Sequence, residues 1–179
     1  MSVAVRSVAE DDLAAVCEIV NHYIANTTIH WSTELEDAGD WRQRWEAGHE
    51  RFPWLVAELD GEVAGIAYAS PFKTRAAYDW CAESTIYLRA GMERKGIGTA
   101  LYARLFDLLD RQGFVSVVAA VALPNPASIR VHESFGFTQA GHYRAVGFKF
   151  GQWLDLAYLQ RLRDRPVEPS PPLPVAAAL

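Results

Sequence analysis

The run FVSVVAAVAL, residues 114–123, constrains the fold of this chain more than any other stretch of its sequence. All of its residues except Ser116 are apolar. A strand with one face in water alternates apolar and polar residues, whereas a strand covered on both faces is apolar along its whole length. We therefore expect a central strand here, in a sheet that has helices on both faces.

Helices are predicted before and after this strand. An apolar helical repeat runs through MERKGIGTALYARLFDLL, residues 92–109, and Gly113 is placed to end it. The short segment NPASIRVHESF, residues 125–135, is also expected to be helical and to stop at Gly136. This alternation of strands and helices is typical of an α/β protein.

The first half of the chain predicts two more helices and four more strands. Residues 3–8, VAVRSV, alternate as a strand does, and a helix should run from about residue 10 to about residue 25. Ser7 and Glu10 have the spacing of a capping box for that helix. The other predicted elements are a tryptophan-rich helix in residues 37–52, a hairpin that turns at Asp60-Gly61, and the strand AESTIYL, residues 82–88.

The resulting expectation is an α/β fold with a mixed central sheet, completed by alternating strands after Phe137. A chain of 179 residues can bury one sizeable core, so we predict a single domain in residues 1–164. The segment RPVEPSPPLPVAAAL, residues 165–179, contains five prolines and is predicted to be an extended tail.

Composition excludes several classes of function. With a net charge of −5 there is no basic field for nucleic acid or for an anionic membrane surface. No apolar run approaches the length of a membrane span, and the N-terminus lacks a signal pattern, so the protein is not expected to be exported. Cys17 and Cys81 have neither paired nor metal-type spacing, which suits the reducing cytoplasm. The five histidines show no ligand spacing, so no metal is predicted.

The stretch ERKGIGT, residues 93–99, has the features of an anion site. Gly96 and Gly98 allow the backbone to approach a ligand, the helix that follows offers unpaired N–H groups, and Arg94 and Lys95 add charge. A phosphate or pyrophosphate is the ligand that these features favour. The stretch does not match the Walker loop, and Leu101 stands where a dinucleotide-binding loop has its third glycine. A surface turn before a capped helix is the alternative that this motif alone leaves open.

The next helix carries three polar groups on one face. Asn125 and His132 are seven residues apart, which is two helical turns, and Ser128 lies between them. An amide, a hydroxyl and an imidazole should therefore point in the same direction.

These two motifs together resemble those of the GNAT acetyltransferases. ERKGIGT is similar to their pyrophosphate loop, and NPASIRVHESFGF is similar to their motif of an Asn followed seven residues later by a Tyr and then by GF. Glu93 stands where that loop usually has Gln or Arg, and His132 stands where Tyr is usual. The histidine narrows the resemblance to the phosphinothricin N-acetyltransferases, which the chain resembles from Arg6 to about Gln160.

The resemblance implies a GNAT fold with about seven strands, acetyl-CoA as co-substrate, and a homodimer. It also implies a set of residues that contact coenzyme A, some through their backbone on the strand beside the loop. These are Ile86, Tyr87, Leu88, Arg94, Lys95, Gly96, Ile97, Gly98, Thr99, Asn125 and Ser128.

Acetyl transfer to an amine requires removal of a proton from the ammonium group, stabilisation of the carbonyl oxygen and departure of the thiolate. Glu83, at the start of the strand AESTIYL, is the candidate base that the resemblance implies, and a rim glutamate is the alternative. His132 is the second catalytic candidate, because an imidazole can act as acid or base near neutral pH. The sequence does not separate the roles of these two residues.

The amine is expected to bind at the loop SPFKTRAAYDW, residues 70–80. Lys73 and Arg75 would bind a carboxylate or phosphinate, with Tyr78 nearby, and Thr28 and Trp31 would close the pocket from the other side. Ordinary solvated loop charges are the alternative for Lys73 and Arg75. Two other functions remain open: acetylation of methionine sulfoximine, methionine sulfone or another small amine, and coenzyme A binding without catalysis.

Overall fold

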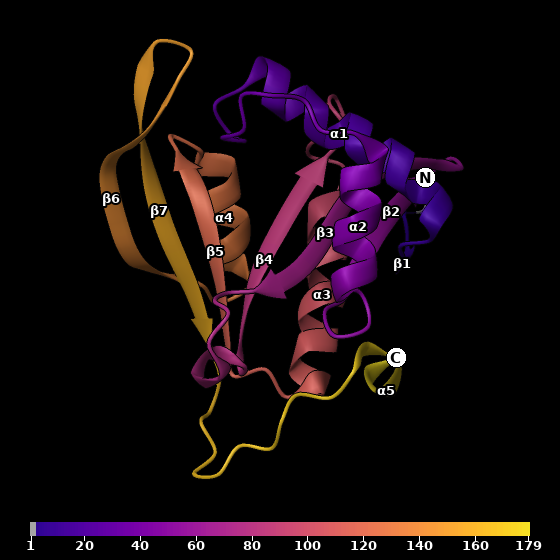
Figure 1. Ribbon diagram of the computed structural model, residues 1–179, viewed down its shortest axis with the longest axis vertical. Coiled ribbons are helices and arrows are strands. Elements are labelled where there is room, and N and C mark those ends of the chain that lie inside the picture. Colours follow the sequence, from indigo (N-terminus) through magenta and orange to yellow (C-terminus); the bar gives the residue numbers. More distant parts are fainter. Residues whose placement is uncertain (1–2) are drawn as a thin grey trace.

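The structure is a computed structural model that describes residues 3–179. A sheet of seven strands forms its centre, with helices on both faces, as the sequence predicted (Figure 1). In chain order the elements are β1 (Ala4–Ser7), η1 (Glu10–Asp12), α1 (Leu13–Asn26), α2 (Ala38–Gly48), β2 (Trp54–Leu59), β3 (Glu62–Pro71), η2 (Ala76–Tyr78), β4 (Cys81–Leu88), α3 (Ile97–Gln112), β5 (Ser116–Leu123), α4 (Pro126–Ser134), β6 (Thr138–Lys149), β7 (Gln152–Leu162) and α5 (Val175–Ala178). No helix in this part of the chain is long and apolar enough to cross a membrane.

The sheet is mixed, and its strand order is β1-β2-β3-β4-β5-β7-β6. Strands β4 and β5 are parallel neighbours, but they pair only through residues 81–83 and 116–118. Beyond Glu83 the two strands separate, which Figure 1 shows as a V between them. The opening at the centre of the sheet therefore exposes backbone of β4 that would otherwise be paired.

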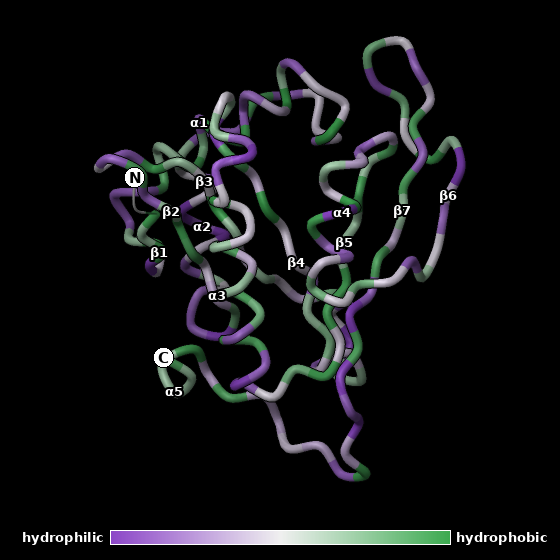
Figure 2. Tube along the Cα trace, turned by 180° about the vertical axis from the view of Figure 1, so that it is seen from behind, coloured by the Kyte–Doolittle hydropathy of each residue, from purple (hydrophilic) through white to green (hydrophobic). Residues whose placement is uncertain are grey.

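Helices cover both faces through two apolar clusters. On β2, Leu55 and Ala57 pack in the cluster that contains α3, whereas Trp54 and Val56 pack in the cluster that contains α1 and α2. Hydrophobic and hydrophilic residues recur within each turn of α3, and the buried ones are spaced three to four residues apart, as in an amphipathic helix (Figure 2). Strand β5 is buried on both faces along most of its length, as its apolar sequence predicted; Ala120 is exposed, and Ser116 and Leu123 at its ends are half-buried.

The Asp60-Gly61 turn is confirmed, with φ angles of 54° and 86° that suit a tight hairpin. The predicted capping box of Ser7 and Glu10 is wrong. Strand pairing continues past Ser7, because the Val8 N–H donates to the Trp54 carbonyl, and the chain turns only at Ala9. The Ala9 N–H then donates to the carboxylate of Asp12 at 2.7 Å.

The proline-rich tail lies against the body of the protein and is not extended to its end. Past Pro174, the last proline, the chain forms the short helix α5, and Ala178 is buried in the cluster that contains α3. The Leu173 N–H donates to the Gln112 carbonyl, and the Gln112 side chain donates to the Leu173 carbonyl. The tail therefore covers the C-terminal end of α3.

Candidate active site

A cavity of about 820 Å³ occupies the opening between β4 and β5. Residues 83–88 of β4 form one wall, and the end of β5 with helix α4 forms the other. The loop before α3 closes one end of it. The cavity thus joins the two segments in which the sequence placed its motifs.

The glycine loop presents backbone N–H groups to this cavity. Gly96 precedes α3 with φ of 79°, a conformation that glycine adopts without strain, and no side chain caps the helix. The N–H groups of its first turn therefore lack intrahelical acceptors. A Cβ atom at Gly98 would lie 3.7 Å from Ile86 and 3.8 Å from Leu88, so the loop packs directly on β4. This geometry suits an anionic ligand at the helix N-terminus.

Successive residues of β4 point to opposite faces of the sheet. Ile86 and Leu88 pack against the cluster that contains α3, whereas Tyr87 packs against the cluster that contains α1. By the same alternation Ser84 faces α3, and Glu83 faces the other side. The two catalytic candidates, Glu83 and His132, therefore approach the cavity from opposite faces of the sheet.

Glu83 is half-buried at the point where β4 and β5 separate. Burial raises the pKa of its carboxyl group, and the positive charge of Lys73 opposes this rise. A carboxylate with a raised pKa is a better proton acceptor at neutral pH than an ordinary glutamate.

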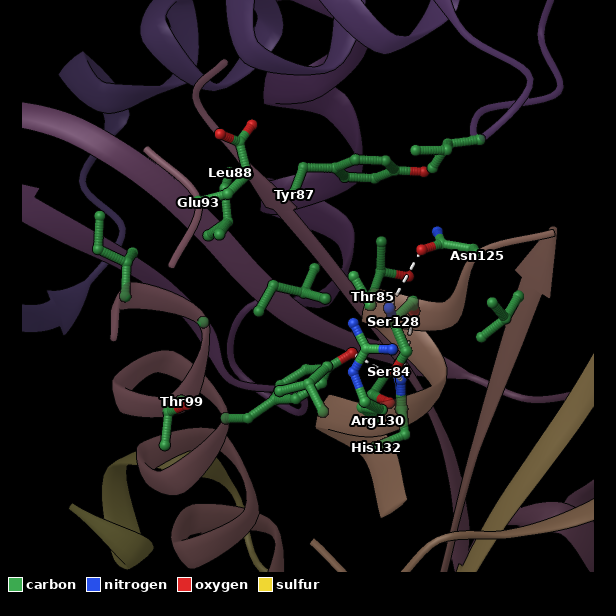
Figure 3. Close-up of a pocket in the computed structure, with 18 of the residues that line it drawn as sticks. Ser84, Thr85, Tyr87, Leu88, Glu93, Thr99, Asn125, Ser128, Arg130 and His132 are labelled. Atoms are coloured by element: carbon green, nitrogen blue, oxygen red, sulfur yellow. Dashed lines mark hydrogen bonds between the residues drawn. The ribbon is translucent and has the colours of Figure 1, made fainter. Parts of the chain in front are cut away.

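His132 lies at the inner wall of the cavity and is only 2% exposed. Its Nδ1 lies 2.7 Å from the Ser128 carbonyl oxygen, and its Nε2 lies 2.9 Å from the Tyr102 hydroxyl. Burial lowers the pKa of the imidazole, while the bond to the Ser128 carbonyl opposes this shift. The ring is therefore neutral near pH 7. Figure 3 shows it beside Ser84 and well apart from Tyr87.

Asn125 and Ser128 also line the cavity, and they stabilise α4 at the same time (Figure 3). The Ser128 N–H donates to the Asn125 side-chain oxygen at 3.1 Å, which caps the helix. The face predicted from their spacing is thus present, with the hydroxyl of Ser128 3.4 Å from His132 Nδ1.

None of the five predicted substrate residues lines this cavity. Lys73 and Tyr78 line a separate hollow of about 200 Å³, although Lys73 is near enough to Glu83 to affect its pKa. Arg75 is exposed. From the segment 27–32 the cavity is lined by Ile29 and His30 and not by the predicted Thr28 and Trp31.

The position of Trp31 follows from its packing. A Cβ atom on Gly147 of β6 would lie 2.9 Å from the Trp31 ring, so the indole lies directly over this glycine. The indole N–H donates to the Thr28 carbonyl, which ties the two residues together. The contact between segment 27–32 and β6 joins residues that are distant in sequence, and no local pattern predicts it.

The family description "Acetyltransferase (GNAT) domain" matches residues 5–157. The chain belongs to the GNAT acetyltransferase family. It is 47% identical to the phosphinothricin N-acetyltransferase of Streptomyces viridochromogenes over 97% of this chain and 94% of that protein. It is 34% identical to the L-methionine sulfoximine/L-methionine sulfone acetyltransferase of Salmonella typhimurium, over 92% of this chain and 97% of that one.

Solved structures of GNAT proteins share the fold. A phosphinothricin acetyltransferase from Sinorhizobium meliloti in complex with acetyl-CoA superposes with a TM-score of 0.90 at 32% identity, over 95% of this chain and 94% of that chain. The predicted fold and the acetyltransferase class are therefore confirmed.

Most of the GNAT loop residues expected at the cavity do line it, but Lys95 does not. Its side chain lies beside Met92 on the outer side of the loop, with Nζ 3.2 Å from the sulfur. Arg130 of α4 lines the cavity in its place as a second cation with Arg94 (Figure 3). Sequence reasoning missed Arg130, because it does not share the i, i+3, i+7 spacing of Asn125, Ser128 and His132.

Sequence reasoning also missed Tyr23, Tyr68 and Tyr102, which line the cavity from three different elements. Tyr102 lies in the apolar repeat of α3, a position that predicts packing in the core. Only its hydroxyl group could have indicated a role beyond packing, because a buried phenol requires a hydrogen-bond partner.

Proposed function

We propose that the protein transfers the acetyl group of acetyl-CoA to the amino group of phosphinothricin or a similar small amino-acid analogue. The observation that carries this proposal is the opening between β4 and β5. It brings a carboxylate from one face of the sheet and an imidazole from the other to a single cavity. A direct transfer needs such an arrangement, because the amine and the thioester must meet between an acceptor and a donor of protons.

Coenzyme A fits the thioester side of this cavity. The free N–H groups at residues 97–99, together with Arg94 and Arg130, suit its pyrophosphate. The backbone of residues 86–88 pairs with β3 but has no β5 partner on the side of the opening, and there it would bind the pantetheine arm and the carbonyl oxygen of the acetyl group. The Leu88 carbonyl already accepts a hydrogen bond from the Tyr23 hydroxyl, which fixes the end of this wall. Lys95 would affect the pyrophosphate through its positive charge alone, without direct contact.

In this proposal Glu83 accepts a proton from the ammonium group of the substrate. His132 is assigned to the side of the cavity from which the thiolate departs. The alternation of β4 supports the assignment, because Glu83 is on the face away from α3 and α4, where the glycine loop and His132 lie. The raised pKa of Glu83 supports it as well, since the carboxylate must hold a proton for part of the reaction.

The amine substrate enters from the Glu83 side in this proposal, near the loop with Lys73, Arg75 and Tyr78. Phosphinothricin has a carboxylate and a phosphinate, so two cations near the acceptor carboxylate suit it. Thr28 and Trp31 do not line the cavity in this proposal; they would hold Ile29 and His30, which do, in position. Methionine sulfoximine and methionine sulfone are the second candidates, because a relative that is 34% identical is named for them.

We also propose that the protein works as a homodimer in the cytoplasm. The hairpin of β6 and β7 exposes more than half of each of four aromatic side chains: Tyr143, Phe148, Phe150 and Trp153. A patch of this kind on one hairpin suits an interface between two copies. Light scattering should give twice the mass of the chain, and Trp153→Glu together with Phe148→Glu should give a monomer.

A substrate screen tests the proposed function. The free enzyme, acetyl-CoA and a thiol reagent would be combined in turn with phosphinothricin, methionine sulfoximine, methionine sulfone, lysine and a simple alkylamine. We expect the amino-acid analogues to give far higher kcat/KM values than lysine or the alkylamine. Comparable values for all amines would contradict the substrate class, and no turnover with any amine would leave coenzyme A binding as the function.

The Arg75→Ala variant tests how the substrate is held. It should raise KM for phosphinothricin more than it lowers kcat, because the lost contact acts equally in the ground state and in the transition state. The loss of such a charge-assisted contact corresponds to about 1.5–3 kcal/mol. An unchanged KM would show that this loop does not bind the anionic end of the substrate.

A further inference from the structure

The imidazole of His30 lines the cavity from segment 27–32, and it carries a hydrogen-bond donor without a partner. The Ser32 N–H donates to His30 Nδ1 at 3.1 Å. A backbone N–H only donates hydrogen bonds, so Nδ1 is the acceptor, and the proton of the neutral ring is on Nε2. Among residues 3–179, no group accepts a hydrogen bond from Nε2–H, and this nitrogen is not a buried atom. A molecule in the cavity can therefore accept a hydrogen bond from it.

The ring is neutral near pH 7. Burial lowers the pKa of His30, and the positive charges of Lys149 and Arg44 lower it further, whereas the negative charge of Glu36 opposes these effects. The bond from Ser32 requires an unprotonated Nδ1, so it also favours the neutral form. Nε2–H is therefore a neutral donor and not half of an ion pair.

His30 is held in place through its backbone and its ring. Its carbonyl accepts a hydrogen bond from the ammonium group of Lys149 at 2.7 Å, and the same group donates to the Ile24 carbonyl at 2.7 Å. Lys149 is 4% exposed, so these two bonds are shielded from water. The His30 ring packs beside Tyr87 of β4, with ring centres 5.8 Å apart. The donor is therefore oriented before a substrate binds, which reduces the entropy that binding costs.

His30 lies on the side of the opening that the proposed amine substrate occupies. Glu83 and Tyr87 are four residues apart on β4, so they share one face of the sheet. Figure 3 shows Tyr87 apart from Ser84 and His132, which lie toward α3. The contact with Tyr87 thus places the imidazole of His30 on the Glu83 face, away from α3.

We propose that His30 determines which amines bind, by donating its Nε2–H to an oxygen of the acceptor substrate. That oxygen belongs either to the α-carboxylate or to the phosphinate, sulfoximine or sulfone end of an amino-acid analogue. The inference rests on the proposed function, in which such an analogue is acetylated. Lys73 and Arg75 do not line the cavity, so His30 provides, inside it, a contact that a simple alkylamine cannot use. A half-buried donor that is left without an acceptor costs free energy, which disfavours amines that lack such an oxygen.

The substitution His30→Phe removes the donor and keeps a ring beside Tyr87. KM for phosphinothricin should rise about 10- to 100-fold, the range for a hydrogen bond to a charged group, with a much smaller change in kcat. KM for a simple alkylamine and the thermal shift with acetyl-CoA should stay the same. His30→Gln carries an N–H group at a similar distance from the backbone and should recover part of the affinity. His22→Phe, which changes an exposed histidine of α1, is the control.

A comparison of methionine with methionine sulfone identifies the oxygen. If the donor binds the side-chain end, His30→Phe lowers kcat/KM for the sulfone more than for methionine, because only the sulfone has an oxygen there. If it binds the α-carboxylate, the substitution lowers both values equally and leaves the alkylamine unaffected.

An unchanged KM for phosphinothricin in His30→Phe would overturn the inference. So would an equal rise in KM for the alkylamine, which would indicate a purely structural role. A weaker thermal shift with acetyl-CoA at an unchanged KM for phosphinothricin would show that His30 contacts the cofactor instead.

The ¹⁵N NMR spectrum of His30 provides a readout that does not depend on turnover. The protein without substrate should show the proton on Nε2. Phosphinothricin added to the complex with coenzyme A should move the Nε2 resonance more than the Nδ1 resonance. An Nε2 resonance that phosphinothricin does not move would overturn the inference even if His30→Phe did not fold.

The same experiments distinguish failure of this inference from failure of the proposed function. If the unaltered protein acetylated none of the amino-acid analogues, the proposed function would fail and this inference with it. If it acetylated them while His30→Phe had a normal KM, only the role of His30 would be overturned.

Discussion

At the scale of single residues, the path of one strand separates the two catalytic candidates. Glu83 and Ser84 are neighbours in sequence, yet β4 directs one away from α3 and the other toward it. His132 shares the α3 side with Ser84, so the carboxylate and the imidazole approach the cavity from opposite faces. The proposed division of roles between Glu83 and His132, which the sequence left open, rests on this strand alternation.

The first prediction concerns Glu83. Glu83→Gln should lower kcat by roughly 10²–10⁴, the range for one positioned acid or base, while the rise in melting temperature with acetyl-CoA persists. Steady-state kinetics and thermal unfolding measure the two effects. A near-normal kcat in this variant across pH 6 to 9 would remove Glu83 from the mechanism.

The pH profile follows from the pKa of the same group. Glu83 must be ionised to accept a proton, so activity falls as the pH drops through its pKa, which burial raises above 4.5. Lys73 lowers this pKa, so Lys73→Ala should shift the acid limb of kcat/KM to higher pH. Arg111→Ala, which removes an exposed charge paired with Asp107 on α3, is the control and should leave the limb in place.

At the scale of elements, the unit of strand, glycine loop and helix is the proposed anion site. Gly98 lines the cavity, and a Cβ atom there would be in ordinary contact with Ile86 and Leu88, so we expect a larger side chain at this position to extend into the space of the ligand. The helix α3 behind it is anchored in the core through Leu101 and Leu105, which are fully buried. The N–H groups at its start are therefore held in place before any ligand binds.

The second prediction tests this unit. Acetyl-CoA should raise the melting temperature of the unaltered protein, and Gly98→Val should abolish the rise while the chain still folds. Gly48→Val in α2 is a matched control, because its Cβ would meet only the Trp54 indole nitrogen, at 3.9 Å. A full shift in Gly98→Val would show that the pyrophosphate binds elsewhere.

A second contact between elements determines the position of segment 27–32 at the cavity. Trp31 lies over Gly147, and the buried ammonium group of Lys149 donates to the carbonyls of Ile24 and His30, at 2.7 Å each. The ammonium group thus ties the end of α1 to segment 27–32, whose Ile29 and His30 line the cavity. The packing near the tip of the β6–β7 hairpin therefore determines the position of segment 27–32.

The third prediction follows from that packing. Gly147→Ala places a Cβ atom 2.9 Å from the Trp31 ring, so segment 27–32 must move. KM for the amine should rise, whereas the thermal shift with acetyl-CoA should stay the same. Gly141→Ala in the same strand meets nothing closer than 3.9 Å and serves as the control. Equal KM values for the two variants would mean that segment 27–32 takes no part in amine binding.

At the scale of the whole molecule, the C-terminal tail belongs to the packed structure. It crosses from β7 to the end of α3 and finishes beside α2, where the Val175 N–H donates to the Glu50 carbonyl (Figure 1). On the way the Trp80 indole N–H donates to the Ser170 carbonyl. Trp80 follows the loop with Lys73 and Arg75, so the tail braces that loop from outside.

The fourth prediction is that removal of residues 173–179 destabilises the protein without abolishing acetyl-CoA binding. Each hydrogen bond lost is worth about 0.5–1.5 kcal/mol, and each kcal/mol lowers the melting temperature of a chain of this size by about 2–4 °C. Val167→Ala changes a fully exposed residue of the same tail and should have no effect. An unchanged melting temperature in the truncated protein would show that the tail does not contribute to the stability of the domain.

The sequence by itself determined the elements, the glycine loop and the family, because these depend on local periodicity, on turn residues and on motifs of fixed spacing. Apolar residues throughout β5 predicted a strand covered on both faces, and Asp60-Gly61 predicted a hairpin. Only the tertiary structure decided that β4 and β5 separate after Glu83, that Tyr102 meets His132, and that Trp31 lies on Gly147 instead of in the cavity. Each of these contacts joins segments that are far apart in the chain, and their geometry depends on how whole strands and helices pack.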